Sequence, residues 1–188
     1  DGNEVRIVTE GADLTLSIAG RTAVNSAASV AYDSHNLPSG EVFTAPAGAT
    51  GEVTFDVPIT VQGRRLRDAH LVFEDGEVVD FDAAEGGGAL ADLLDTDAGA
   101  KRLGELGVGM NRGITRPTDN VLFDEKMAGT VHLALGRAYD ACLPDGETGN
   151  ESAVHTDLIT RMDEGSRLVV DGETIQRDGR FRWEDGFE

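Results

Sequence analysis

The chain of 188 residues lacks most features that crosslink a protein or anchor it in a membrane. Its one cysteine, Cys142, excludes an internal disulfide and every zinc site built from several cysteines. No apolar run approaches the roughly 18 residues that a membrane-spanning helix requires. The hydrophobic content of 39% is nevertheless too high for a typical disordered acidic tail. Length and composition therefore predict one domain, residues 1–188, with a core of its own.

Positive charge is also scarce, since 16 Lys and Arg face 35 Asp and Glu, for a net charge of −19. Nucleic acids and anionic membranes carry the same sign, so we expect neither as a partner. Lys101 and Lys126 are the only lysines, and acid excess with few lysines resembles the proteins of salt-loving microbes. Molar salt shortens the Debye length to about 3 Å and suppresses repulsion among such charges. We therefore favour a halophilic protein over an ordinary acidic one.

Several short signatures are missing as well. No basic segment followed by an apolar one stands near Asp1, so a cytoplasmic location is the expectation. The chain contains no P-loop, no Gly-x-Ser-x-Gly nucleophile elbow and no His-Glu-x-x-His. The run from Asp95 to Leu106 begins like a calcium-binding EF-hand loop but has Leu where the loop needs Glu. Helix capping is the better interpretation of its acidic residues.

Alternating apolar and polar residues predict strands over most of the chain. The predicted strands are 5–8, 13–18, 41–45, 52–57, 71–74, 77–81, 153–159, 168–170, 173–175 and 180–183. Asp75-Gly76 and Asp171-Gly172 separate two pairs of these strands and predict tight hairpins. Turn chemistry at 35–40 predicts a loop. Asp178-Gly179 then turns the chain again, so the last twenty or so residues are predicted to form a meander.

Helix signals are fewer. Residues 89–94 and 98–103 predict one broken helix or two short ones. The candidate caps are Asp95, Thr96 and Asp97. Asp124 is a candidate cap for a third helix running from 125 towards 139. The expected fold class is α+β, a β-rich domain with several antiparallel hairpins and a few short helices.

Two groups of residues suggest chemistry by their spacing. His155 and Asp157 share one face of a predicted strand, where an imidazole and a carboxylate can bind one metal or two adjacent ones. With so many acids in the chain, a His-x-acid pair also arises readily by chance. Glu125, His132 and Tyr139 are spaced by sevens and would lie on one face of the predicted helix. The alternative is a capped helix with a half-buried His and Tyr.

Two glutamates lie in segments where a carboxylate is unusual. Glu41 follows Pro-Ser-Gly and opens a strand. Glu105 lies among glycine, leucine and valine, so it is expected to be partly desolvated and to need a partner. An arginine is the commonest partner for such a carboxylate, and a metal ion comes second. Each glutamate taken alone predicts only a structural role.

Five separated segments, in this order, resemble the thermophilic-type metallo-aminopeptidases, the aminopeptidase T, aminopeptidase S and PepS family. They are 36–46 (NLPSGEVFTAP), 104–109 (GELGVG), 120–126 (NVLFDEK), 129–139 (GTVHLALGRAY) and 150–157 (NESAVHTD). The resemblance extends from about residue 13 to 181. Family members are longer and carry an N-terminal α/β domain, so this chain resembles their C-terminal metal-binding domain.

The resemblance implies a site for two divalent metal ions, such as zinc, cobalt or manganese. The implied ligands are Glu41, Glu105, His132, His155 and Asp157. Tyr139 matches the active-site tyrosine of the family. Glu125 and Lys126 match its Asp-Glu-Lys stretch, and their roles are left open.

The implied activity is removal of N-terminal residues from peptides that have a free amino terminus. In this mechanism two metal ions activate a water to hydroxide, Glu105 doubles as general base and Tyr139 stabilises the oxyanion. A homodimer is implied for the longer family form. Two alternatives remain: a metal-binding domain without catalysis of its own, and an acidic β-rich interaction module.

Overall fold

The computed structural model describes residues 2–27 and 37–187. Its strands are β1 (Glu4–Thr9), β2 (Ala12–Ser17), β3 (Val24–Asn25), β4 (Glu41–Thr44), β5 (Gly48–Phe55), β6 (Ile59–Val61), β7 (Arg64–Glu74), β8 (Glu77–Glu85), β9 (Leu103–Gly109), β10 (Thr130–Gly136), β11 (His155–Arg161), β12 (Arg167–Val170), β13 (Glu173–Arg177) and β14 (Arg180–Phe181). The helices are α2 (Gly87–Leu94) and α3 (Val121–Asp124), and short 3₁₀ turns are η1 (Ala98–Lys101) and η2 (Asp140–Cys142).

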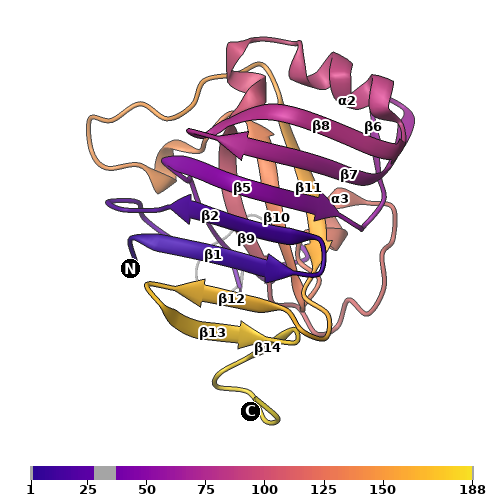
Figure 1. Ribbon diagram of the computed structural model, residues 1–188. Helices are drawn as coiled ribbons and strands as arrows, with labels where there is room; N and C mark the ends of the chain where they lie inside the picture. Colours follow the sequence, from indigo (N-terminus) through magenta and orange to yellow (C-terminus); the bar gives the residue numbers. More distant parts are fainter. Residues whose placement is uncertain (1, 28–36, 188) are drawn as a thin grey trace.

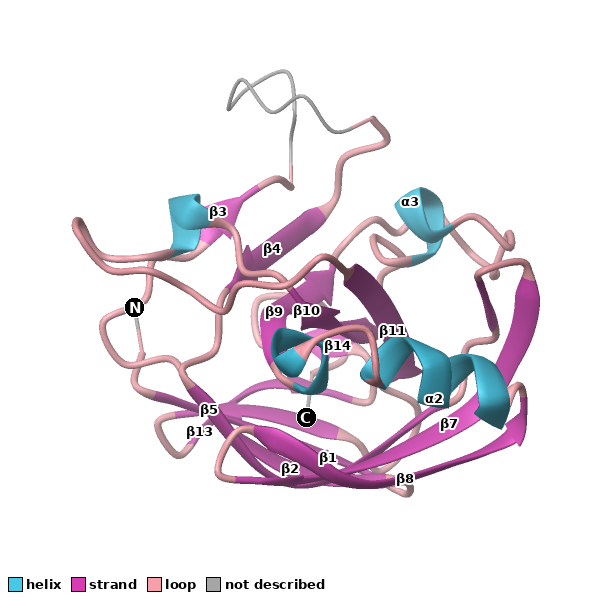
Figure 2. Cartoon of the chain, turned by 90° about the horizontal axis from the view of Figure 1, so that it is seen from above, coloured by secondary structure: helices cyan, strands magenta, loops and turns pink. Residues whose placement is uncertain are grey.

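Two antiparallel sheets form the two layers of the fold. The larger sheet has the order β14-β13-β12-β1-β2-β5-β7-β6, with β8 paired to β7. The smaller sheet has the order β11-β10-β9-β4-β3. Figure 1 shows β9, β10 and β11 behind the larger sheet and running across its strands, and Figure 2 shows the two layers one above the other. The predicted β-rich α+β class is confirmed.

The main core lies between the two sheets because both present an apolar face there. Leu14 and Leu16 of β2 are fully buried, as are Leu133 and Leu135 of β10, and all four belong to one hydrophobic cluster. Full burial of each such side chain contributes about 1.5–3 kcal/mol. Since alternate residues of a strand point to opposite faces, the other face of β10 is turned away from this core.

The Asp-Gly hairpins form where the sequence predicts them. Asp75 and Gly76 have φ values of 50° and 80°, and Asp171 and Gly172 have values of 48° and 83°. Two consecutive residues with positive φ are what a two-residue turn needs to match the twist of its strands. The turns join β7 to β8 and β12 to β13, and β14 then completes the predicted meander.

The predicted helix from 125 to 139 is wrong. Residues 130–136 form strand β10, which pairs with β9 on one side and β11 on the other. The short helix α3 ends at Asp124 and is capped by the Asn120 side chain, which accepts a hydrogen bond from the Leu122 amide. In β10 the apolar residues alternate, which suits a strand buried on one face, and long-range pairing decides between strand and helix.

The remaining helical predictions hold in part. Residues 89–94 are helical within α2, while the second segment forms the 3₁₀ turn η1 and Leu103 begins β9. Asp97 is the cap, because its side chain accepts a hydrogen bond from the Ala100 amide. Of the loop predicted at 35–40, residues 35 and 36 lie outside the described residues, and 37–40 have no helix or strand. No helix in the described ranges is long and apolar enough to cross a bilayer.

Candidate metal centre

Four neighbouring strands of the smaller sheet each carry one or two of the predicted ligands. Glu41 begins β4, Glu105 lies in β9 and His132 in β10. His155 and Asp157 lie in β11. Since β11, β10, β9 and β4 are adjacent in that order, the sheet brings together residues that are far apart in the sequence.

Strand register and small residues make room for the charged side chains. Ala134 of β10 lies opposite Glu105 on one side and Asp157 on the other. Gly107 of β9 lies opposite His132. A Cβ atom on Gly107 would come within 1.9 Å of His132 Nε2, so only glycine leaves space for this imidazole. The glycines of the 104–109 segment therefore serve the site as well as the strand.

Glu105 lies between the two imidazoles. Its Oε1 is 3.1 Å from His132 Nε2, and its Oε2 is 3.6 Å from His155 Nε2. His155 Nε2 is in turn 3.7 Å from Asp157 Oδ1. His132 has no exposed surface, and Glu105 is 4% exposed. One buried carboxylate thus faces two ring nitrogens with its two oxygens.

Glu41 connects the histidine side of the cluster to a buried ion pair. Its Oε2 is 3.4 Å from His132 Nε2, and its Oε1 is 3.4 Å from Lys126 Nζ. The Lys126 ammonium also donates a hydrogen bond to Glu125 Oε1. Lys126 has no exposed surface and Glu125 is 7% exposed, so both belong to the buried cluster.

His155 is oriented by a backbone contact. Its Nδ1 donates a hydrogen bond of 2.7 Å to the Arg137 carbonyl oxygen, and its Nε2 faces Glu105 and Asp157. The Tyr139 ring lies against the same imidazole, with ring centroids 4.8 Å apart, and contacts Phe43 on its other side at 5.8 Å. Tyr139 remains half-exposed, so the phenol lies at the solvent-facing border of the cluster.

Several pKa values in the cluster are shifted because its carboxylates are crowded and buried. Burial lowers the pKa of His132, but the hydrogen bond to Glu105 and the nearby carboxylates outweigh it and raise the value to about 9. Burial raises the pKa of Asp157 to about 6, although His132 opposes the shift. Burial also raises the pKa of Glu41. Burial and the same carboxylates raise the pKa of the Tyr139 phenol to about 12.

The donor set fits divalent metal ions. Glu41, Glu105 and His132 each offer a ligand atom, and these atoms lie within 4.8 Å of one another. Three carboxylates and two imidazoles are ligands that suit zinc, cobalt and manganese. The Arg137 carbonyl fixes the tautomer of His155, as partners of metal-binding histidines commonly do. Divalent ions would compete with protons for these carboxylates and imidazoles.

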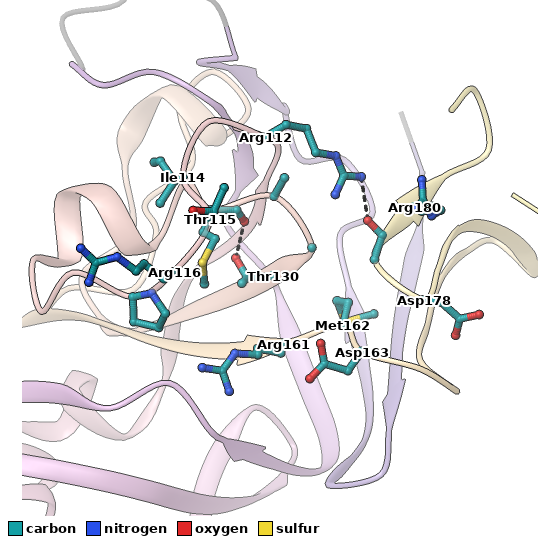
Figure 3. A pocket seen from close by; sticks show the side chains of 15 residues that line it. Arg112, Ile114, Thr115, Arg116, Thr130, Arg161, Met162, Asp163, Asp178 and Arg180 are labelled. Atoms are coloured by element: carbon teal, nitrogen blue, oxygen red, sulfur yellow. Dashed lines mark hydrogen bonds between the residues drawn. The ribbon is translucent and has the colours of Figure 1, made fainter. Parts of the chain in front are cut away.

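One cavity adjoins the cluster, and another lies apart from it. The residues that line a cavity of about 430 Å³ include His155, Asp157, Ile59 and Val121. The cavity of about 560 Å³ in Figure 3 includes Arg112, Arg116, Arg161 and Arg180 but none of the predicted site residues. Two of its arginines are paired with carboxylates, Arg112 with Glu184 and Arg161 with Asp56.

The structure differs from the sequence-based prediction in which elements carry the residues of the cluster. Glu125, His132 and Tyr139 do come near the same cluster, but from a helix end, a strand and a loop rather than from one helix face. The described partners of Glu105 are histidines, and not an arginine, which is the commonest partner of a buried carboxylate. Sequence reasoning left the role of Lys126 open. Lys126 is one of only two lysines in the chain, and it is fully buried.

Comparisons with known proteins agree with this arrangement. A family described as "Thermophilic metalloprotease (M29)" matches residues 1–181. Aminopeptidase 2 of Geobacillus stearothermophilus is 37% identical over 161 residues, which cover 77% of this chain and 37% of that protein. Aminopeptidase T of Thermus aquaticus is 36% identical over 171 residues, which cover 79% of this chain and 40% of that protein.

A solved structure shows the same fold. The wild-type AmpT of Thermus thermophilus superposes with a TM-score of 0.83 at 31% sequence identity, over 96% of this chain and 50% of that one. The chain thus spans about two fifths of the length of the curated relatives named above. Because the family match covers nearly the whole chain, the protein belongs to the M29 family of thermophilic metalloproteases.

Proposed function

We propose that the protein is a metal-dependent aminopeptidase that removes N-terminal residues from peptides at a centre of two divalent ions. The observation that carries the proposal is the position of Glu105, whose two oxygens face the two imidazole nitrogens at 3.1 and 3.6 Å. A carboxylate in that position can serve two ions at once. The names of the relatives, which are aminopeptidases, support the reaction class.

In this proposal Glu41 and His132 complete one side of the centre, and His155 and Asp157 complete the other. Divalent ions held there would polarise the scissile carbonyl, lower the pKa of the attacking water and accept the lone pair of a free α-amine. Glu105 is also the proposed general base, because its carboxylate lies between the two halves of the centre.

Tyr139 is the proposed hydrogen-bond donor to the oxyanion of the transition state. A phenol is a hydrogen-bond donor through its O–H group, and such a donor can stabilise a developing oxyanion. Its ring lies against His155 at the border of the cluster, where a substrate carbonyl can approach. The neighbouring cavity of about 430 Å³ has room for the side chain of the N-terminal residue.

The alternative is a metal-binding domain that is inactive without further residues. It is favoured by the share of the relatives that the chain spans, 37% and 40%. In both cases the ligands belong to this chain, so metal binding is common to the two functions and peptide cleavage separates them.

The test compares a leucyl peptide with its N-acetylated form, with and without a strong chelator, and counts the metal ions per chain. We expect two ions per chain, cleavage of the free peptide only, and loss of cleavage with chelator, because acetylation removes the lone pair of the amine. Two ions without cleavage would favour the alternative. Chelator-resistant cleavage, or cleavage of the acetylated peptide, would contradict the proposed mechanism.

A further inference from the structure

Lys126 is a charged side chain with no exposed surface, which is rare for lysine unless the ammonium is paired. The other lysine of the chain, Lys101, keeps 41% of its side chain exposed and lies 3.9 Å from Asp95 at the surface. A buried lysine pays a large desolvation cost, so its place beside the candidate centre needs a reason.

The backbone fixes Lys126 from both directions. Its amide donates to the Phe123 carbonyl at 3.2 Å, and its carbonyl accepts from the Asn111 amide at 2.9 Å. Asp124, two residues before Lys126, is buried too. It accepts hydrogen bonds from the amide and hydroxyl of Thr118 at 2.8 and 2.7 Å. These bonds hold the main chain of Lys126 in place, and the carboxylates of Glu41 and Glu125 hold its ammonium.

The two carboxylate oxygens of Glu41 have different neighbours, and one of these neighbours is the ammonium of Lys126. Oε1 is 3.4 Å from the ammonium, and Oε2 is 3.4 Å from His132 Nε2. Glu105 differs, because both of its oxygens face imidazole nitrogens. One carboxylate thus turns both oxygens to the centre, while the other turns one oxygen to the centre and one to Lys126.

We propose that Lys126 is a positioning residue that restricts Glu41 to one-oxygen coordination of its metal ion. The inference rests on the proposed metal centre. Glu125 has a part in this positioning, because its carboxylate accepts a hydrogen bond from the Lys126 ammonium and holds that group in place. Attraction of cations is not the function of Lys126, since an ammonium repels them. The carboxylates of Glu41, Glu105, Glu125 and Asp157 outnumber it.

The sharpest variant is the double substitution E125Q/K126M, which removes one charge of each sign and leaves the net charge of the cluster unchanged. Without the ammonium, Oε1 of Glu41 loses its contact with Lys126 and can turn toward the metal ion that Oε2 binds. The control is Lys101→Met, which removes the exposed lysine. Lys126→Arg is a second variant that keeps the positive charge but changes its shape and reach.

The experiment titrates Co²⁺ into the 188-residue chain after metal removal and records the visible absorption spectrum and the ions bound per chain. Because cobalt bands report coordination geometry, we expect E125Q/K126M to bind the same number of ions with weaker bands, as a higher coordination number requires. We also expect one of the two affinities to fall by roughly 10–100-fold, as when a residue behind a metal ligand is replaced. Lys101→Met should match the wild type.

Three results would overturn the inference. The first is a wild-type spectrum and wild-type affinities in both E125Q/K126M and Lys126→Arg. The second is loss of the folded circular dichroism signal in both variants at saturating cobalt, which would make Lys126 a residue of the fold alone. The third is a wild-type chain that binds no cobalt, which would also remove the metal centre of the proposed function. Failure of peptide cleavage alone would leave the positioning role standing.

Discussion

Small residues decide where the charged groups of the site can lie. The face of β9 and β10 that carries Glu105 and His132 also carries Gly107 and Ala134, which lie opposite His132, Glu105 and Asp157 across the strands. A larger side chain at either position would fill the space that an imidazole or a carboxylate now occupies. The arrangement of the site therefore depends on residues without functional groups.

Gly107→Ala tests this dependence. The added Cβ would lie 1.9 Å from His132 Nε2, and both strands are held by neighbours, so the imidazole has to turn. We expect a loss of stability of about 1–3 kcal/mol from overpacking. We also expect the metal affinity to fall roughly 10–100-fold, as when a ligand loses its support.

The measurements are the ions retained per chain after dialysis and the thermal midpoint. Gly48→Ala is the matched control, since Gly48 begins β5 and a Cβ there would meet nothing within 4 Å. A Gly107→Ala protein that keeps wild-type ion content would show that His132 tolerates the methyl group and that the ring position is unimportant.

At the scale of elements, short sequence motifs predicted the hairpin turns correctly, whereas the segment that forms β10 was predicted to be a helix. Asp75-Gly76 and Asp171-Gly172 specify their turns by their own backbone preferences, and both were found as expected. The 125–139 segment has no such local signal. Its strand is specified by pairing with β9 and β11, which are distant in sequence. The sequence named the candidate ligands through resemblance, but only the register of four strands gives their arrangement.

Asp97 connects two elements next to the site. Its carboxylate accepts hydrogen bonds from the Ala100 amide in η1 and from the Ala153 amide and Ser152 hydroxyl, just before β11, at 2.9, 2.7 and 2.8 Å. These bonds, that of Ala153 foremost, lower the pKa of Asp97. A carboxyl group whose pKa is lower in the folded state stabilises the fold above its unfolded pKa of about 3.9, and the gain is lost as pH falls through the folded value.

The substitution Asp97→Asn should therefore lower the thermal midpoint at pH 7, and the gap from the wild type should narrow as the pH falls below about 4. Melting curves across this range, recorded with chelator so that metal release does not contribute, measure the gap. Asp95→Asn is the control, because its exposed pair with Lys101 at 3.9 Å is worth about 0–1 kcal/mol. A gap that stays constant down to pH 3 would contradict the assignment.

For the whole molecule, the two-sheet architecture separates two kinds of interior. The space between the sheets is apolar, whereas the other face of the smaller sheet carries the buried Glu41, Glu105 and His132, with the buried Lys126 beside them. Period-2 patterning predicted most strands of the larger sheet, which form one side of the first interior, but it missed β9 and β10 on the other side. Local sequence predicted partial desolvation of Glu105, but it did not predict the burial of Glu41 and Lys126, because their burial depends on how distant parts of the chain pack together.

The net charge of the chain determines how its stability should depend on salt. The chain carries a net charge of −19, which already counts its arginines, and exposed pairs such as Arg6–Asp13 stabilise the fold only weakly because solvent and salt screen them. Repulsion among the uncompensated carboxylates is therefore the larger effect of salt, and screening it should stabilise the fold. We expect the unfolding midpoint to rise between about 0.1 and 3 M KCl, with most of the rise below about 1 M, where the Debye length falls from about 10 to 3 Å. A rise that continues in proportion to salt concentration would indicate a strengthened hydrophobic effect instead. A flat or falling midpoint would rule out the halophilic interpretation of the composition.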